Sequence, residues 1–427
     1  MSNRKRLISN FVSLSGVRIA GFVFPLITLP YLVRVLGPEK YGLVAFAQAF
    51  ALYFVVLTDY GFNLSATREI SLNRDNIKKV SLIFWSVFFV KFILLLLSFV
   101  IFAAIIFSFE KFSQDKMVYF YAFGVVLGQV VFPLWFFQGI EKMKYIASLN
   151  ILTKLIFTVA IFIFITEEGD YIYLPLLYSL GFVLSGLIGL YLAIHQFKVK
   201  FVVPSKEEIF NQLKEGWHIF ISTIAINFYT TSNTIILGIF TNNTIVGYYS
   251  AADKVIKAIL QAILYPLSQT IYPHVSNLAQ QSKENALRFI RKVLSIVAPG
   301  AFMLSAGLFI FAEPFCNIVL GKQYASSIIV LRILAFVPFV VALSNIFGVQ
   351  VMLNLGLKKH FTNILIIAGC FNIILCVVLV LLYGLIGVSS VVLITELLVT
   401  VIMFWDLKRI GIDVISGHIK IKERYEI

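Results

Sequence analysis

Twelve apolar stretches of about twenty residues or more fill most of this 427-residue chain. A helix needs about 20 consecutive apolar residues to cross the hydrocarbon core of a bilayer. The sequence therefore predicts an all-α, polytopic membrane protein with twelve transmembrane helices. The expected spans are residues 10–33, 41–59, 80–107, 117–137, 145–166, 171–195, 216–240, 245–271, 293–311, 326–355, 361–383 and 386–407.

The composition rules out an ordinary soluble domain. Hydrophobic residues make up 60% of the chain and charged residues 13%, whereas soluble domains are about half apolar and about a quarter charged. A net charge of +14 would point to nucleic acid in a soluble protein, but in a membrane protein basic loops orient the helices. No nucleic-acid partner is therefore expected. Cys316, Cys370 and Cys376 lie inside apolar stretches and match no disulfide framework, zinc motif or haem motif.

Basic residues outside the apolar stretches lie mainly on one side of the predicted membrane. With both termini in the cytoplasm, the inner segments hold most of them, and the outer loops hold only Arg34, Lys40, Lys111, Lys116 and Lys322. The positive-inside rule then predicts a multi-pass protein with both termini cytoplasmic. The outer loops are short, and no catalytic constellation or phosphate-binding glycine loop is present. Neither an enzyme nor a bound cofactor or metal is therefore expected.

The two halves of the chain share a short pattern at the ends of their first apolar stretches. Its copies are Leu36-Gly37 with Tyr41-Gly42, and Leu237-Gly238 with Gly247-Tyr248-Tyr249. Internal repeats frame a central site in secondary transporters. We therefore predict an N-terminal six-helix lobe, residues 1–200, and a C-terminal six-helix lobe, residues 201–427.

Three expected spans carry polar residues on one helix face. In these spans the polar residues recur at spacings of three, four and seven, which places them on one side of a helix. They are Ser250, Asp253, Lys254, Lys257, Gln261 and Ser268; Thr223, Asn227, Thr230 and Thr234; and Asn150, Lys154 and Thr158. Such stripes either line a polar lumen or make hydrogen bonds between helices.

Six basic residues lie inside expected spans, namely Arg18, Lys91, Lys154, Lys254, Lys257 and Arg332. A charge at a helix centre costs about 2.5–3.5 kcal/mol on insertion scales, so such residues normally face a polar cavity and serve function. Arg18 lies near the cytoplasmic end, where a long side chain can also snorkel. Lys91 needs a partner such as Asp59 or Glu396, and Arg332 has Glu313 as an alternative partner.

Three acidic residues accompany these cations in or beside the spans. Asp59 and Asp253 are expected to be counter-ions or to carry a coupling proton. Glu396, near the middle of the last span, is either a counter-ion or a protonatable coupling group, because burial without a partner raises a carboxyl pKa.

A short amphipathic helix is predicted between the two halves. Ser205-Lys206-Glu207-Glu208, after Pro204, matches a capping box. Ile209, Phe210 and Leu213 then either face the lipid headgroups or belong to an ordinary amphipathic linker.

Several short motifs together resemble those of O-antigen flippases. They are Pro30-Tyr31-Leu32-Val33-Arg34-Val35-Leu36-Gly37-Pro38 with Tyr41-Gly42; Asp59-Tyr60-Gly61-Phe62-Asn63 with Ala66-Thr67-Arg68; Pro133-Leu134-Trp135-Phe136-Phe137-Gln138-Gly139 with Glu141 and Met143; Ile235-Ile236-Leu237-Gly238; Gly247-Tyr248-Tyr249-Ser250-Ala251-Ala252; and Ser344-Asn345-Ile346-Phe347-Gly348-Val349-Gln350. In combination they cover almost the full chain. The chain resembles the Wzx-type polysaccharide flippases of the multidrug/oligosaccharidyl-lipid/polysaccharide (MOP) exporter superfamily.

The resemblance implies two six-helix lobes around a central cavity, as in MATE-type exporters, with alternating access driven by an ion gradient. The implied cargo is an undecaprenyl-diphosphate-linked oligosaccharide, moved from the cytoplasmic to the periplasmic leaflet of the bacterial inner membrane. Lys and Arg suit phosphate, so the basic residues are expected to hold the diphosphate and glycan: Arg18, Lys154, Lys254, Lys257 and Arg332, with Lys91 as a further candidate. The implied partners are this substrate, membrane lipids, the O-antigen polymerase and the chain-length regulator.

Three alternatives remain open at this stage. A cation-coupled multidrug exporter of the same fold is expected to have an acidic lumen, whereas basic residues outnumber acidic ones in these spans. The polysaccharide polymerase of the same pathways needs a large periplasmic loop. A flippase for the peptidoglycan precursor is also related by fold, but the first-hairpin motif favours the O-antigen flippases.

Overall fold

The computed structural model describes the backbone of residues 3–414 and 418–419, and the side chains of residues 21, 23–221, 223–224 and 231–414. Almost all of the described backbone is helical, as the apolar stretches predict. A two-residue antiparallel strand pair, β1 (Ile412–Asp413) with β2 (His418–Ile419), follows the last helix. Contacts divide the chain into two compact units, Met1–Asn227 and Phe228–Ile427.

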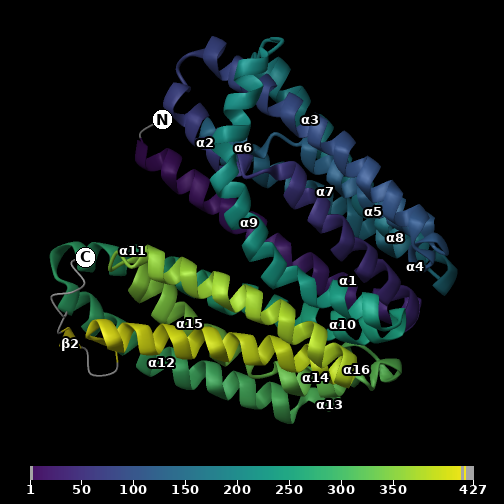
Figure 1. The fold of residues 1–427 in the computed structure, drawn as a ribbon, viewed down its shortest axis with the longest axis vertical. Coiled ribbons are helices and arrows are strands. Elements are labelled where there is room, and N and C mark those ends of the chain that lie inside the picture. Colours follow the sequence, from purple (N-terminus) through teal and green to yellow (C-terminus); the bar gives the residue numbers. More distant parts are fainter. Residues whose placement is uncertain (1–2, 415–417, 420–427) are drawn as a thin grey trace. The chain divides into compact units, whose positions relative to one another are not determined.

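Figure 1 shows the helices of both units. The first unit contains α1 (Asn3–Asp59), α2 (Phe62–Asn73), α3 (Ile77–Ser108), α4 (Glu110–Ser113), α5 (Lys116–Val131), α6 (Leu134–Gly139), α7 (Met143–Phe164), η1 (Glu168–Ile172), α8 (Tyr173–Tyr191), η2 (Leu192–Gln196) and most of α9 (Lys206–Phe240). The second unit contains the rest of α9, α10 (Asn243–Ile259), η3 (Leu260–Leu264), α11 (Tyr265–Gln281), α12 (Lys283–Ile310), α13 (Ala312–Val319), η4 (Lys322–Tyr324), α14 (Ser327–Leu334), α15 (Val337–Ser344), η5 (Asn345–Leu353) and α16 (Lys358–Ile410).

Eight helices in the described part of the chain are long and apolar enough to cross a membrane. This confirms the predicted polytopic helical membrane protein. The helical segments Val23–Asn73 and Lys358–Ile410 have 51 and 53 residues, about twice the length that one span requires. Each therefore has room for two of the predicted spans, and the structure is consistent with the expected twelve.

The first long helix, α1, is interrupted at Gly37, where φ is 65° and ψ is 173°. Before this point Tyr31 donates a hydrogen bond to the carbonyl of Ile165, 2.7 Å away, at the end of α7. After it Phe54 contacts Phe102 of α3. The two halves of α1 therefore pack against different helices. Glycine adopts a positive φ at little cost, which explains the residue at this turn.

The last long helix, α16, is a hairpin that turns at Gly384, where φ is 51° and ψ is −118°. Hydrogen bonds pair residues at similar distances on either side of the turn. Asn372 Nδ2 donates to Thr395 Oγ1 over 3.0 Å, and His360 Nδ1 lies 2.9 Å from Asp406 Oδ2. The two halves therefore run antiparallel, and they correspond to the last two predicted spans.

Small residues form the interface between α5 and α8. Gly124 faces the side chain of Ser179, and Gly128 faces the backbone of Phe182. Gly186 in turn lies against the carbonyl of Gly128. Without side chains at these positions the two backbones approach closely, which is how helices pack in a membrane when van der Waals contact replaces the hydrophobic effect.

Each unit contains a cluster of buried apolar side chains. The core of the first unit is rich in aromatic residues and includes Phe62, Phe84, Trp135, Phe136 and Phe137. The core of the second unit is mainly aliphatic and includes Val275, Leu287, Val351, Met352, Met403 and Leu407.

The predicted capping box at the start of α9 is present. The Glu208 N–H donates to Ser205 Oγ over 3.2 Å, and the Ser205 N–H donates to Glu208 Oε2 over 2.6 Å. Ile209 and Leu213 are partly buried and pack against the core of the first unit, which supports the second alternative, an amphipathic linker. Phe210 alone of the three is exposed, at 66%. Burial of two of the three apolar side chains explains why this helix belongs to the first unit.

We expect Gly128→Ala to destabilise the protein, because a Cβ at this position would lie 2.5 Å from the carbonyl carbon of Phe182. Overpacking typically costs about 1–3 kcal/mol, which lowers the Tm by several degrees. Gly307→Ala in α12 is the matched control, since nothing lies within 4 Å of its added Cβ. Thermal melting of the solubilised protein compares the two. Equal Tm values for both variants would contradict the proposed α5–α8 packing.

Candidate functional site

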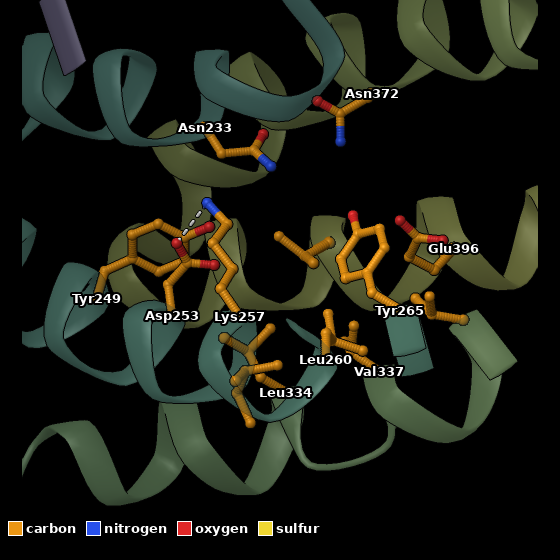
Figure 2. A pocket seen from close by; sticks show the side chains of 13 residues that line it. Asn233, Tyr249, Asp253, Lys257, Leu260, Tyr265, Leu334, Val337, Asn372 and Glu396 are labelled. Carbon is orange, nitrogen blue, oxygen red and sulfur yellow. Dashed lines mark ion pairs between the residues drawn. The ribbon is translucent and has the colours of Figure 1, made fainter. Parts of the chain in front are cut away.

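A polar cavity of about 220 Å³ lies within the second unit. Its walls come from α9, α10, η3, α11, α14, α15 and both halves of α16. The polar side chains that line it, drawn in Figure 2, are Asn233, Tyr249, Asp253, Lys257, Tyr265, Asn372 and Glu396. Apolar side chains such as Leu260, Leu334 and Val337 complete the lining. Charged and amide groups thus meet in one cavity among helices that are otherwise largely apolar.

One ion pair dominates the α10 side of the cavity. Lys257 Nζ lies 2.7 Å from Asp253 Oδ2, one helical turn away. The Asp253 side chain is 15% exposed and the Lys257 side chain is 52% exposed. Figure 2 shows the Lys257 ammonium reaching toward Asn233. Two residues of the predicted polar face of this span, Asp253 and Lys257, therefore line a cavity.

Two asparagines add hydrogen-bond acceptors to the cavity. The Oδ1 atoms of Asn233 and Asn372 are both buried without a donor among the described residues. Asn372 uses its Nδ2 to donate to Thr395 Oγ1, so its orientation is fixed by the α16 hairpin. A buried acceptor without a donor costs about 1–3 kcal/mol. Hydroxyl groups, water and cations are the chemical groups that satisfy such oxygens.

Glu396 places a carboxyl group in the same cavity, on the second half of α16. In Figure 2 its side chain lies near Tyr265, across the cavity from the Asp253–Lys257 pair. The cavity therefore holds two carboxyl groups and one ammonium group.

In the first unit, Lys91 of α3 is paired with Asp59, the first of its two predicted partners. Its Nζ lies 3.8 Å from Asp59 Oδ1 and 3.2 Å from the carbonyl oxygen of Gln129. The ring of Trp135 lies 5.8 Å away. The Lys91 side chain is only 5% exposed. The ammonium group of Lys91 is therefore surrounded by other groups of the protein.

Lys154 of α7 is half-buried and differs from Lys91 in its surroundings. Its Nζ lies 3.5 Å from the point where a Cβ on Gly21 of α1 would lie. It forms no ion pair or hydrogen bond with the described side chains or backbone. The neighbouring Thr153 is hydrogen-bonded to Ser185 of α8, which holds this stretch of α7 against the unit. Lys154 thus presents an ammonium group that no described carboxylate neutralises.

The remaining predicted cations are spread over both units. Arg332 Nη2 lies 3.7 Å from Glu313 Oε2, the alternative partner expected for it, and both side chains are substantially exposed. Lys254 is half-buried on α10 but is not part of the cavity lining. The side chain of Arg18 lies outside the described residues. Of the nine predicted site residues, the cavity contains Asp253, Lys257 and Glu396.

Four polar residues of the cavity were not predicted from the sequence, namely Asn233, Tyr249, Tyr265 and Asn372. Asn233 directly precedes Thr234, the last residue of a predicted polar stripe. Asn372 is an isolated amide inside a predicted apolar span. That isolation is the signal that sequence reasoning overlooked.

Comparisons with known proteins agree with this architecture. A family model described as "Polysaccharide biosynthesis protein" matches residues 7–279. A "Putative O-antigen transporter" of Escherichia coli (strain K12) is 35% identical to this chain over 404 residues, covering 94% of this chain and 97% of that protein.

Two solved structures share the fold. An inward-facing multidrug resistance transporter of the MATE family and the MOP superfamily has a TM-score of 0.68 at 14% identity, covering 96% of this chain and 98% of its own. The lipid II flippase MurJ, in an inward closed conformation, has a TM-score of 0.60 at 15% identity, covering 94% of this chain and 87% of its own. These matches confirm the predicted MATE-like helical fold.

We expect a cysteine at position 257 to react with a charged thiol reagent in isolated membranes, because the Lys257 side chain is 52% exposed. In a background without Cys316, Cys370 and Cys376, Lys257→Cys should react at least about ten times faster than Ser98→Cys, because thiol modification follows access. Ser98 of α3 is fully buried and serves as the reference. Quantitative labelling checks this, and equal rates would show that water does not reach the Lys257 side of the cavity.

Proposed function

Because the chain belongs to the polysaccharide biosynthesis protein family, we propose that it moves a lipid-linked oligosaccharide from the cytoplasmic to the periplasmic leaflet of a bacterial inner membrane. The name of the Escherichia coli relative, a putative O-antigen transporter, supports this cargo class. The shared fold with a lipid II flippase supports movement of a lipid headgroup across the bilayer. The proposed activity is transport and involves no covalent step.

The observation that carries the proposal is Lys154, a half-buried ammonium group in a spanning helix without a described partner. An unneutralised cation in such a helix is costly and normally faces a polar pathway. A diphosphate linkage supplies the anion that this group lacks, and a charged hydrogen bond to phosphate oxygen is among the strong ones. The anionic link of the cargo, with the lipid tail left in the bilayer, therefore fits Lys154.

The other predicted cations are proposed to contact the same cargo. Arg18, Lys254, Lys257 and Arg332 supply positive charge on other helices, and Lys and Arg are suited to phosphate and to acidic sugars. Lys257 and Arg332 are paired with carboxylates, so each exchanges one anionic partner for another when cargo arrives. We propose that the two compact units are the two six-helix lobes of an alternating-access cycle.

Ion coupling is proposed to use the acidic residues of the cavity. Glu396 and Asp253 line it together with two amide oxygens that have no described donor. Protonation of Glu396, or cation binding to it, would change the net charge of the cavity. Asp59 is the third acidic candidate, and its ion pair with Lys91 supports a counter-ion role.

The cellular setting is proposed from the same cargo. We propose that both termini lie in the cytoplasm, because most basic residues outside the spans then lie on the inner side of the membrane. In the proposed pathway the O-antigen polymerase and the chain-length regulator act on the product in the periplasm. These proteins and the surrounding membrane lipids are the proposed partners.

We expect Lys154→Ala to reduce surface polysaccharide at least about tenfold at an unchanged protein level. A hydrogen bond to a charged group contributes about 1.5–3 kcal/mol, which corresponds to about tenfold or more. The double variant Lys254→Ala, Lys257→Ala should behave alike. Lys322→Ala, which removes an exposed loop lysine, is the charge-matched control and should transport normally. Surface glycan and lipid-linked sugar accumulation are measured in a strain that lacks its own flippase.

Full surface glycan in Lys154→Ala and in the double variant would remove all three lysines from the site. The runner-up function is cation-coupled multidrug export, favoured by the shared fold with a MATE transporter and by the two carboxyl groups of the cavity. It predicts drug resistance when the protein is expressed in efflux-deficient cells. The proposed flippase should instead restore surface glycan without changing drug sensitivity.

A further inference from the structure

Lys91 lies where two helices of the first unit end. α1 ends at Asp59, and Tyr60 and Gly61 follow with positive φ values of 48° and 79°. α5 ends at Val131, and α6 begins only after Pro133. A single ammonium group on α3 thus lies beside two interruptions of helical backbone.

The α5–α6 interruption frees one backbone carbonyl. In a continuous helix the carbonyl of Gln129 would accept a hydrogen bond from the N–H four residues later. That residue is Pro133, which has no N–H. Lys91 Nζ donates to this carbonyl over 3.2 Å. The lysine therefore supplies the donor that the proline removes.

The charge of Lys91 is balanced by a carboxylate at the end of α1. Asp59, the last residue of α1, lies 3.8 Å from the ammonium group, and the face of Trp135 on α6 lies 5.8 Å away. With a side chain that is 5% exposed, Lys91 has little surface left for cargo. Its surroundings contrast with those of Lys154, which has no described partner.

Both interrupted helices lead into one block of short helices. Thr67 Oγ1 of α2 lies 3.2 Å from the carbonyl of Trp135 and 3.3 Å from Gln138 Oε1 of α6. Ile70 of α2 packs against Gly139 of α6. α2 and α6 therefore form a packed pair, and this pair joins the spanning helices α1 and α5 at Asp59 and Gln129.

We propose that Lys91 is a positioning residue that ties the end of α1 to the α5–α6 interruption and thereby fixes the α2–α6 pair on the spanning helices. This role differs from the cargo-binding role expected from the sequence. Removing Lys91 alone leaves the largely buried carboxylate of Asp59 and the Gln129 carbonyl without this partner, which is destabilising, whereas removing both charges of such a pair is often tolerated. The proposed positioning role of Lys91 therefore predicts the outcome of two pairs of substitutions.

The first experiment compares Lys91→Met, Asp59→Asn and the double variant in the full-length protein. We expect each single variant to lower the Tm of the solubilised protein by at least about 5 °C and to reduce surface glycan at least tenfold. The double variant should regain most of both losses. If Lys91 instead binds anionic cargo, the double variant stays inactive at a normal Tm, and the proposal is overturned.

The second experiment uses Pro133→Ala, which returns an N–H to the position that bonds the Gln129 carbonyl. Lys91→Met should lower the Tm by less in this background than in the wild type. Lys154→Met is the matched control, and its effect should be independent of both Asp59→Asn and Pro133→Ala. If the effect of Lys91→Met on the Tm is additive with those of Asp59→Asn and Pro133→Ala, the Lys91 side chain only fills space. That result would overturn the proposed positioning role.

Discussion

The cost of placing a charged group in apolar surroundings organises both units of this protein. Lys91, Lys257 and Arg332 lie beside the carboxylates of Asp59, Asp253 and Glu313. Lys154 has no described partner. An isolated charge inside a spanning helix is costly, and we propose that some of these pairs are fixed structural contacts whereas cargo replaces others. The extent of burial separates these two cases, since Lys91 is 5% exposed and Lys257 is 52% exposed.

Backbone polar groups are also costly in apolar surroundings, because each N–H and C=O inside the membrane needs a hydrogen-bond partner. Where a helix continues, its own hydrogen bonds suffice. Where it is interrupted the chain provides a substitute, as Lys91 does for the carbonyl of Gln129. Gly384 lets α16 reverse within one residue, so that Asn372 and Thr395 meet across the hairpin. The turn therefore also orients a side chain of the cavity.

Much of the architecture follows from the sequence because long apolar runs and caps are local signals. The helical fold, the capping box at Ser205 and the face that carries Asp253 and Lys257 were predicted correctly. The cavity as a whole was not predicted, because Asn233 and Asn372 come from distant helices and only packing brings them together. The burial of Ile209 and Leu213 also depends on tertiary contacts, which an amphipathic pattern alone does not reveal.

Charge balance also bears on the choice between cargo classes. A lumen for cationic drugs needs carboxylates in excess, and within the cavity of the second unit the carboxyl groups do outnumber the single ammonium group. The first unit shows the opposite balance, since Asp59 is paired with Lys91 and Lys154 has no described anion. A lysine at the first position and two carboxyl groups at the second suit ligands of opposite charge. In the transport cycle that we propose, an anionic headgroup binds at Lys154 and a coupling cation binds near Glu396.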